Sequence, residues 1–390
     1  MNPSRLYIRR GGGLLIALSI AGLMLAGTAG EAFAASKKKD TGPSFSLGRK
    51  AKNELTADMT EQMVLANIQN QKMILDLQDP TSPDYPEMVV ALADFYWDLS
   101  ETYFRKANTD ELEQALYDAE EKGDKLEIER VKNIQRELWK RTRDYQEQTI
   151  RTYREVIAKY PQTKTIDELR YYLAYHLTTM GEGREGVQAY TDLILKHPDS
   201  RYVPDSLVNI GDHYFDTNDY RNAMKLYEQL AQYPGSPLLA YASYKQAWCL
   251  YNIGDYDGSL SRLITVIKLT RGQHEDGVTG AIDLMEEAQN ELVFPYSKVG
   301  KPGAAIAFFR RFVPTRYLQI SSKLAGMYTE QTEYVKSNKL LRTLMKEARA
   351  PSEGESQLHM VLSFQRQIVT NAHLQVDKAA AVSEIQYLIT

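Results

Sequence analysis

The sequence is poor in cysteine and carries no large excess of either charge. Cys249 is the only cysteine in 390 residues, so the chain cannot form an internal disulfide. The formal net charge is only −4, from 47 basic and 51 acidic side chains. Proteins that bind nucleic acids usually present a basic surface to the phosphates, so this charge argues against nucleic acid as the principal partner.

Long apolar runs are also scarce, and the pronounced one lies close to the N-terminus. A basic segment at residues 5–10 precedes apolar residues 14–26, and an A-x-A cleavage pattern ends at Ala34. The apolar run is too short to span a bilayer. We interpret residues 1–34 as a signal peptide that is cleaved after Ala34. The Arg9-Arg10 pair leaves the twin-arginine export route open beside the general secretory route.

The remainder of the chain lacks the features that would hold it in a membrane. It has no apolar run of the ~20 residues that a transmembrane helix needs, and no cysteine at the cleavage site to carry a lipid. We therefore expect a soluble mature protein in the periplasm of a Gram-negative cell, with no integral membrane segment. Residues 35–50 are polar, basic and interrupted by Gly and Pro, which predicts a flexible linker.

The chain also has a strong internal period. Residues 205–263 hold two copies of one pattern about 36 residues apart. In each copy a small residue and an aromatic precede a polar turn, Asp-Tyr opens a second helix, and a small and a large residue follow. The copies are Gly211, Tyr214, Asp219, Tyr220, Ala223 and Tyr227, and then Ala247, Tyr251, Asp255, Tyr256, Ser259 and Leu263. Pro161, Pro198 and Pro234 recur at the same step and end units, because proline cannot continue a helix.

This pattern resembles the tetratricopeptide repeat, in which a small residue lies where two helices touch, an aromatic closes the turn and a proline ends the unit. The resemblance extends over residues 87–390 and implies an all-α fold, a right-handed α-solenoid of helical hairpins. The Tyr-Pro endings are also similar to those of envelope members of the superfamily. These include the outer-membrane assembly lipoprotein BamD, the TolA-binding YbgF proteins and the repeat proteins of deltaproteobacterial gliding machinery.

The segment before the regular repeats predicts further helices. Residues 51–86 indicate an N-terminal helix and a proline-rich connection. Residues 87–161 predict an extended helical hairpin, broken at residues 122–124, although a single solvated helix without a partner surface is an open alternative. The solenoid then spans residues 162–390. Its units are expected at 167–198, 204–234, 240–270, 286–314, 321–351 and 356–390.

Three motifs point to chemistry, but none has the context that the chemistry needs. Residues 181–186 spell G-x-G-x-x-G, yet a helical pattern precedes them instead of the strand that a dinucleotide site requires. Two of these glycines fall on the turn and the helix contact of a repeat. Asp255 begins a stretch similar to a calcium loop but lacks the later ligands, so it indicates a helix N-cap. Cys249 is expected to be an inert core thiol.

We therefore expect no catalytic residue, no cofactor and no metal. The six histidines have no metal-binding spacing, although histidines far apart in the sequence could still converge at a surface metal site. An enzyme or carrier with an unrecognised site is accordingly one alternative for the function.

The resemblance implies a protein-binding surface, because the first helix of each repeat lines a concave groove. Aromatic residues at such positions are typical of interface hot spots. The groove residues it implies are Tyr171, Tyr175, Asp212, Phe215, Tyr244, Trp248, Tyr251, Asn252, Phe294 and Lys298. The alternative is that this aromatic stripe belongs to the core.

The functional hypothesis is a non-enzymatic periplasmic scaffold in an envelope-associated machine, for gliding motility, envelope assembly or transport. Its expected partners are other periplasmic or outer-membrane proteins of a multiprotein complex. A TolA-binding-like accessory factor of cell division or the cell wall is a second alternative.

Overall fold

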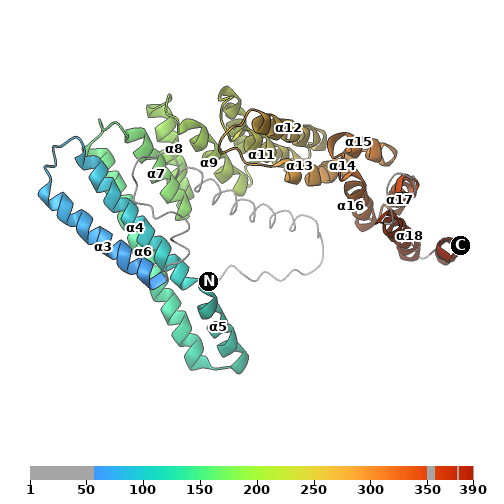
Figure 1. The fold of residues 1–390 in the computed structure, drawn as a ribbon, viewed down its shortest axis with the longest axis horizontal. Helices are drawn as coiled ribbons and strands as arrows, with labels where there is room; N and C mark the ends of the chain where they lie inside the picture. The colour runs from blue at the N-terminus through green and yellow to red at the C-terminus, as the bar shows by residue number, and fades with distance from the viewer. Residues whose placement is uncertain (1–56, 349–355, 376, 390) are drawn as a thin grey trace. The chain divides into compact units, whose positions relative to one another are not determined.

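The computed structural model describes residues 57–348, 356–375 and 377–389, and every regular element in these ranges is a helix (Figure 1). The predicted all-α fold of helical repeats is confirmed. The predictions for residues 1–56, namely the signal peptide, the linker and the start of the first helix, lie outside the described residues. In the part of the chain that is described, no helix combines the length and apolarity needed to cross a membrane.

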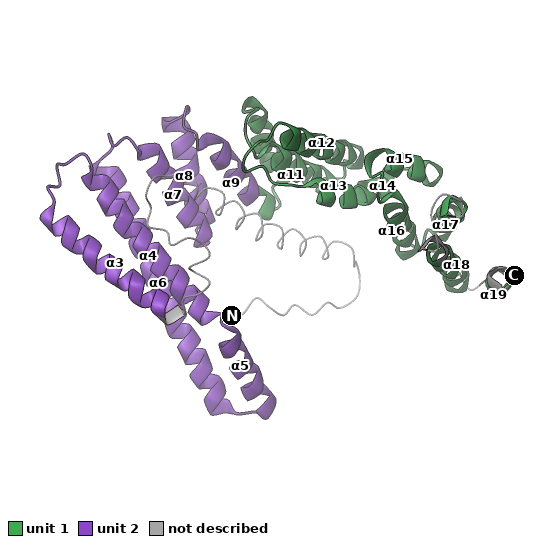
Figure 2. Cartoon of the chain, in the orientation of Figure 1, with its two compact units in different colours: residues 1–42, 214–390 green, residues 43–213 purple. Residues whose placement is uncertain are grey.

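The chain divides into two compact units, which Figure 2 shows in different colours. Unit 2 comprises residues 43–213, and the described part of unit 1 begins at residue 214. The boundary falls within helix α9 (Val203–Asp216), inside the stretch for which the sequence predicts one continuous solenoid.

The described part of unit 2 begins with α3 (Ala57–Leu77), and three of its long helices pack against one another. Helix α3 lies on α4 (Tyr85–Ala107), and α4 runs beside α6 (Lys125–Lys159) (Figure 1). One core cluster joins all three helices. It contains Val64 and Ile68 of α3, Leu92, Tyr96, Leu99 and Tyr103 of α4, and the partly buried Leu138 and Tyr145 of α6.

The connection between α4 and α6 contains a break that the sequence analysis did not predict. The chain leaves the helix at Asn108, and Thr109 caps a new helix, α5 (Asp110–Lys122), by accepting a hydrogen bond from the Leu112 N–H at 3.4 Å. The predicted break follows, where Gly123 adopts φ 66° and Asp124 caps α6. The long hairpin is thus formed by α4 and α6, with α5 as a short helix between them.

Helices α7 (Ile166–Thr179) and α8 (Gly183–Lys196) form the next hairpin of unit 2. Gly181 turns the chain with φ 85°, and Gly186 lies where the helices touch. A Cβ at Gly186 would lie 2.3 Å from Cγ2 of Thr178, so no larger residue fits without movement. The prediction that these glycines serve the turn and the helix contact is confirmed.

In unit 1 the repeats continue with α10 (Tyr220–Gln229) and the short 3-10 helix η1 (Leu230–Gln232). Helices α11 (Leu239–Asn252) and α12 (Tyr256–Glu275) form the next pair. The small residues expected at the helix contacts, Ala223 and Ser259, are buried, and so are the large residues Tyr227 and Leu263 that follow them.

The following repeat has a divided first helix. Helix α13 (Met285–Glu291) ends just before α14 (Val293–Val299) begins. Pro295 has no N–H to bond the Glu291 carbonyl, which accounts for the division at this point. The remaining elements are η2 (Pro302–Ala304), α15 (Ala305–Phe312), α16 (Tyr317–Glu330), α17 (Tyr334–Ala348), α18 (Ser356–Leu374) and α19 (Lys378–Ile389).

Candidate functional site

The structure distributes the ten expected groove residues over both units. In unit 2, the Tyr171 side chain is only 1% exposed, and its ring stacks on Tyr202 with 4.7 Å between centroids. This places Tyr171 in the core, as the alternative interpretation of the aromatic stripe predicts. Tyr175 and Asp212 are half-buried.

The remaining seven residues lie in unit 1, where four aromatic side chains converge. The Trp248 ring lies 6.5 Å from Tyr244, 5.5 Å from Tyr251 and 6.0 Å from Phe294, measured between centroids. Tyr244 and Tyr251 are buried, whereas Trp248 and Phe294 are half-buried and reach the surface. Of the four, Trp248 and Phe294 are therefore the ones that can contact a ligand.

The other three expected residues of unit 1 lie outside these ring contacts. Phe215 packs against Tyr220 at 5.5 Å and under the ammonium group of Lys245. Asn252 is exposed and donates a hydrogen bond to the backbone oxygen of Trp248 at 2.8 Å. Lys298 is exposed near the end of α14.

Glu291, which the sequence analysis did not identify, lies beneath the aromatic residues. Its carboxylate accepts one hydrogen bond from the Tyr244 hydroxyl at 2.9 Å and another from Trp248 Nε1 at 3.0 Å. These bonds tie the last residue of α13 to α11 and fix the orientation of the indole. Glu291 and Phe294 are three residues apart, a spacing that the sequence alone assigns to one helix face, although the helix divides between them in the structure; this was the only signal for Glu291 in the sequence.

Burial changes the ionisation of this carboxyl group. Removal from water raises the pKa of Glu291 to about 7, against the opposing effects of the Tyr244 and Trp248 hydrogen bonds and of the nearby Lys323 charge. The neighbouring carboxylate of Glu287 raises the pKa further. Near neutral pH the Glu291 carboxyl is therefore only partly ionised.

Lys323 of α16 completes the surface. Its ammonium nitrogen lies 4.8 Å from the centroid of the Phe294 ring and donates to the backbone oxygen of Asn290 at 3.4 Å. We call the half-buried and exposed side chains Trp248, Phe294 and Lys323, with Glu291 beneath them, the Trp248 surface. It combines two aromatic faces with one cation, an arrangement suited to noncovalent recognition.

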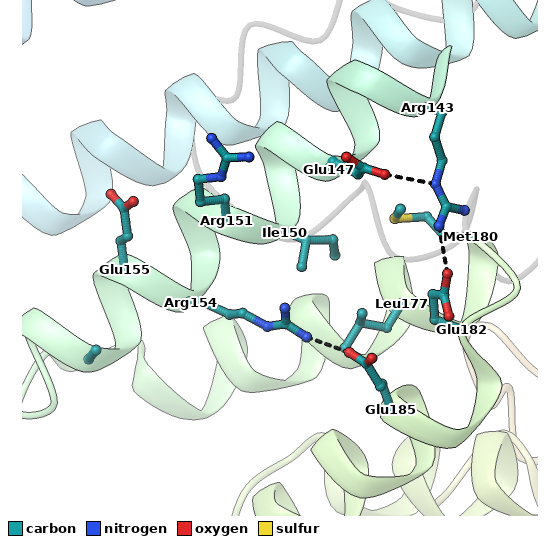
Figure 3. Close-up of a pocket in the computed structure, with 11 residues that line it drawn as sticks. Arg143, Glu147, Ile150, Arg151, Arg154, Glu155, Leu177, Met180, Glu182 and Glu185 are labelled. Carbon is teal, nitrogen blue, oxygen red and sulfur yellow. Dashed lines mark hydrogen bonds and ion pairs between the residues drawn. The ribbon is translucent and has the colours of Figure 1, made fainter. Parts of the chain in front are cut away.

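Unit 2 contains a pocket of about 520 Å³ between α6, the end of α7 and the start of α8 (Figure 3). Ile150 and Leu177, both buried, form part of its apolar lining. Most of its charged side chains form ion pairs with one another. Arg143 pairs with Glu182 at 2.6 Å and with Glu147 at 3.1 Å, and Arg154 pairs with Glu185 at 2.5 Å. These ion pairs link α6 to α8, so we interpret the pocket as a groove between packed hairpins.

Another strongly shifted group is His176 in unit 2. It is 5% exposed, and its ring lies 4.0 Å from that of Trp97 and 5.4 Å from that of Tyr153. Burial lowers the pKa of His176 to about 3, so the imidazole is neutral at ordinary pH. It packs as an aromatic core residue and presents no surface to a ligand.

Within the described ranges, no three His, Cys, Asp or Glu side chains lie close enough together to hold a metal ion. Cys249 is fully buried on α11, as expected for a core thiol.

Residues 205–236 and 241–269 match the sequence model of the tetratricopeptide repeat. No curated protein matches the chain.

Several solved structures are similar to the chain. A tetratricopeptide repeat protein from Parabacteroides merdae is 13% identical, with 72% of this chain and 91% of that chain covered and a TM-score of 0.34. The apo form of RapI is 11% identical, with 85% and 96% covered and a TM-score of 0.40. The APC/C hetero-tetramer Cut9-Hcn1 is 13% identical, with 76% and 54% covered and a TM-score of 0.32. These TM-scores are too low to support an argument about function.

Proposed function

The chain carries tetratricopeptide repeats, and from this premise we propose that it is a non-enzymatic scaffold that binds another protein through the Trp248 surface. Repeats of this kind are typical of proteins that hold other proteins together, and the repeat matches at 205–236 and 241–269 include α11, which carries Trp248.

The observation that carries the proposal is the fixed orientation of a partly exposed tryptophan. Its indole N–H is bonded to Glu291, and its ring contacts Tyr251 and Phe294. A side chain that is held in place before binding loses little conformational entropy when a partner arrives. Tryptophan is also among the residues enriched in interface hot spots.

The chemistry of the surface suggests the kind of segment that fits it. The Trp248 and Phe294 rings would pack against apolar side chains of the partner, and the Lys323 ammonium would face an acidic group. The charged side chains of the unit 2 pocket are already paired with one another, so they are less available to bind a partner protein.

The sequence of residues 1–34 supports a location in the periplasm, where the partners would be other periplasmic or outer-membrane proteins. The scaffold would then belong to an envelope-associated complex.

A tryptophan comparison tests the proposed surface. Trp248→Ala should weaken partner binding by about 2 kcal/mol or more, the usual scale of a hot spot, which is on the order of 30-fold in Kd. Trp139→Ala is the matched control, because Trp139 is 43% exposed and lies in unit 2 on α6. The partner would be identified by capture from envelope fractions, and its affinity measured with purified proteins.

Circular dichroism and thermal melting would accompany these measurements. Unchanged binding by a folded Trp248→Ala variant would contradict the proposal, and loss of binding in Trp139→Ala instead would move the partner site to the α4–α6 hairpin. Loss of fold in Trp248→Ala would show that the indole is a core residue, contrary to the proposal.

A further inference from the structure

Helix α3 packs on the rest of unit 2 with one apolar face and has a second face of mostly apolar, exposed residues. Val64 and Ile68 are buried against α4, and Leu75 packs on the same cluster. Gln71, on this face, donates from Nε2 to the backbone oxygen of Met88 at 2.8 Å. Figure 1 shows α3 at the outer side of α4.

The second face is a regular stripe of exposed residues. Its members are Met59, Met63, Ala66, Asn70, Met73 and Leu77. They alternate in steps of four and three along the helix, which is the spacing of the a and d positions of a coiled coil. Met63, Asn70 and Leu77 occupy a positions, and the other three occupy d positions. A surface helix that packs on a core with one face usually has polar residues on the opposite face, so this second stripe, which we call the seam, indicates a further contact.

The residues beside the stripe favour a like partner. The flanking e and g positions are Thr60, Asn67, Ile74, Gln62, Gln69 and Asp76. Only the last of these is charged, so two copies of the helix could meet without the like-charge repulsion that commonly keeps identical helices apart. Ile74, which is 43% exposed, would add apolar contact at the edge of the seam.

We propose that α3 binds α3 of a second copy of this chain as a parallel, two-stranded coiled coil. Asn70 is the polar residue at a central a position, and a single buried Asn there specifies two strands and their register. In a parallel pair the two Asn70 side chains would face each other.

The seam spans fewer than three heptads, which is short for a coiled coil that must be stable on its own. In this chain, however, α3 is already held by its other face against α4, so association need not form the helix. The proposal concerns unit 2 alone and does not depend on the Trp248 surface.

A pair of substitutions on one helix tests the association. Met63 and Leu65 are each 38% exposed, but Met63 lies in the seam and Leu65 outside it. Met63→Glu should weaken self-association of the purified chain at least tenfold, and Leu65→Glu should leave it within about twofold, since a charge at an a position would be buried. Sedimentation equilibrium over a concentration series would measure both.

A chain that remains monomeric at all concentrations, or that forms trimers, would overturn the proposal. So would association that survives Met63→Glu or is lost equally in the two variants. Both positions are exposed, so circular dichroism should show that both variants keep their helices.

Disulfide trapping tests the orientation. Met73→Cys should crosslink to itself on oxidation, because equivalent positions face each other in a parallel pair. The natural Cys249 is buried and does not compete. An antiparallel pair would instead crosslink Met73→Cys to Met63→Cys in a mixture of the two variants, and that result would contradict the proposed register.

Discussion

Glu291 is the residue through which pH changes the charge of the Trp248 surface. Glu291 is half-buried, and the partial removal of its carboxyl from water raises its pKa from 4.5 to about 7. The folded protein therefore retains a proton between these pH values that the unfolded chain releases. The resulting stabilisation is full below pH 4.5 and is lost as the pH rises toward and through about 7.

We expect this group to contribute roughly 2–3 kcal/mol to the fall in the free energy of unfolding between pH 4.5 and pH 8. Glu291→Gln should flatten the profile by that amount, because glutamine has no proton to release. Urea unfolding of both proteins across this range would measure the difference. Parallel profiles for the two proteins would show that the native carboxyl titrates normally.

Trp248 and Phe294 could be predicted from the sequence, whereas Glu291 could not. The aromatic positions follow from the repeat register, which the Asp-Tyr turns and the small contact residues determine. Glu291 lies in a segment that also contains Glu286 and Glu287, and no local pattern shows which of the three carboxylates accepts the hydrogen bonds of Tyr244 and Trp248. Its role depends on hydrogen bonds from α11, more than forty residues earlier in the sequence.

At the scale of elements, the small contact residues of the repeats are the features that the sequence predicts best. Ala223, and Ala305 at the corresponding contact position of the 286–314 unit, are both fully buried, as expected of small residues where two helices pass closely. The break before α5 could not be predicted as readily. It depends on a single threonine cap at Thr109 within a charged segment that otherwise has helical character throughout.

Two alanines of α15 allow a matched test of the contact position. Ala305 is fully buried, and Ala307, two residues later, is exposed. Ala305→Leu should overpack the contact and cost about 1–3 kcal/mol of stability, whereas Ala307→Leu should have little effect. At ~2–4 °C for each kcal/mol, thermal melting would resolve the two variants. Equal melting temperatures would contradict the assignment of the contact.

At the scale of the whole molecule, the two proposed surfaces belong to different units. The α3 seam lies in unit 2 and the Trp248 surface in unit 1. They share no residue, so substitutions in one should act independently of substitutions in the other. A dimer joined through α3 would carry two Trp248 surfaces, and this number matters wherever the partner is itself present in many copies.

We therefore expect the α3 seam to influence binding to an immobilised partner but not to a partner in solution. Two linked sites bind a dense surface more tightly than one, because the second contact forms at a high effective concentration. Met63→Glu should reduce the apparent affinity for densely immobilised partner at least tenfold and leave the affinity in solution unchanged, whereas Trp248→Ala should reduce both. Surface plasmon resonance and calorimetry would provide the two measurements. An equal loss in both formats for Met63→Glu would mean that α3 contacts the partner directly, and no loss in either would mean that the two surfaces of a dimer do not act together.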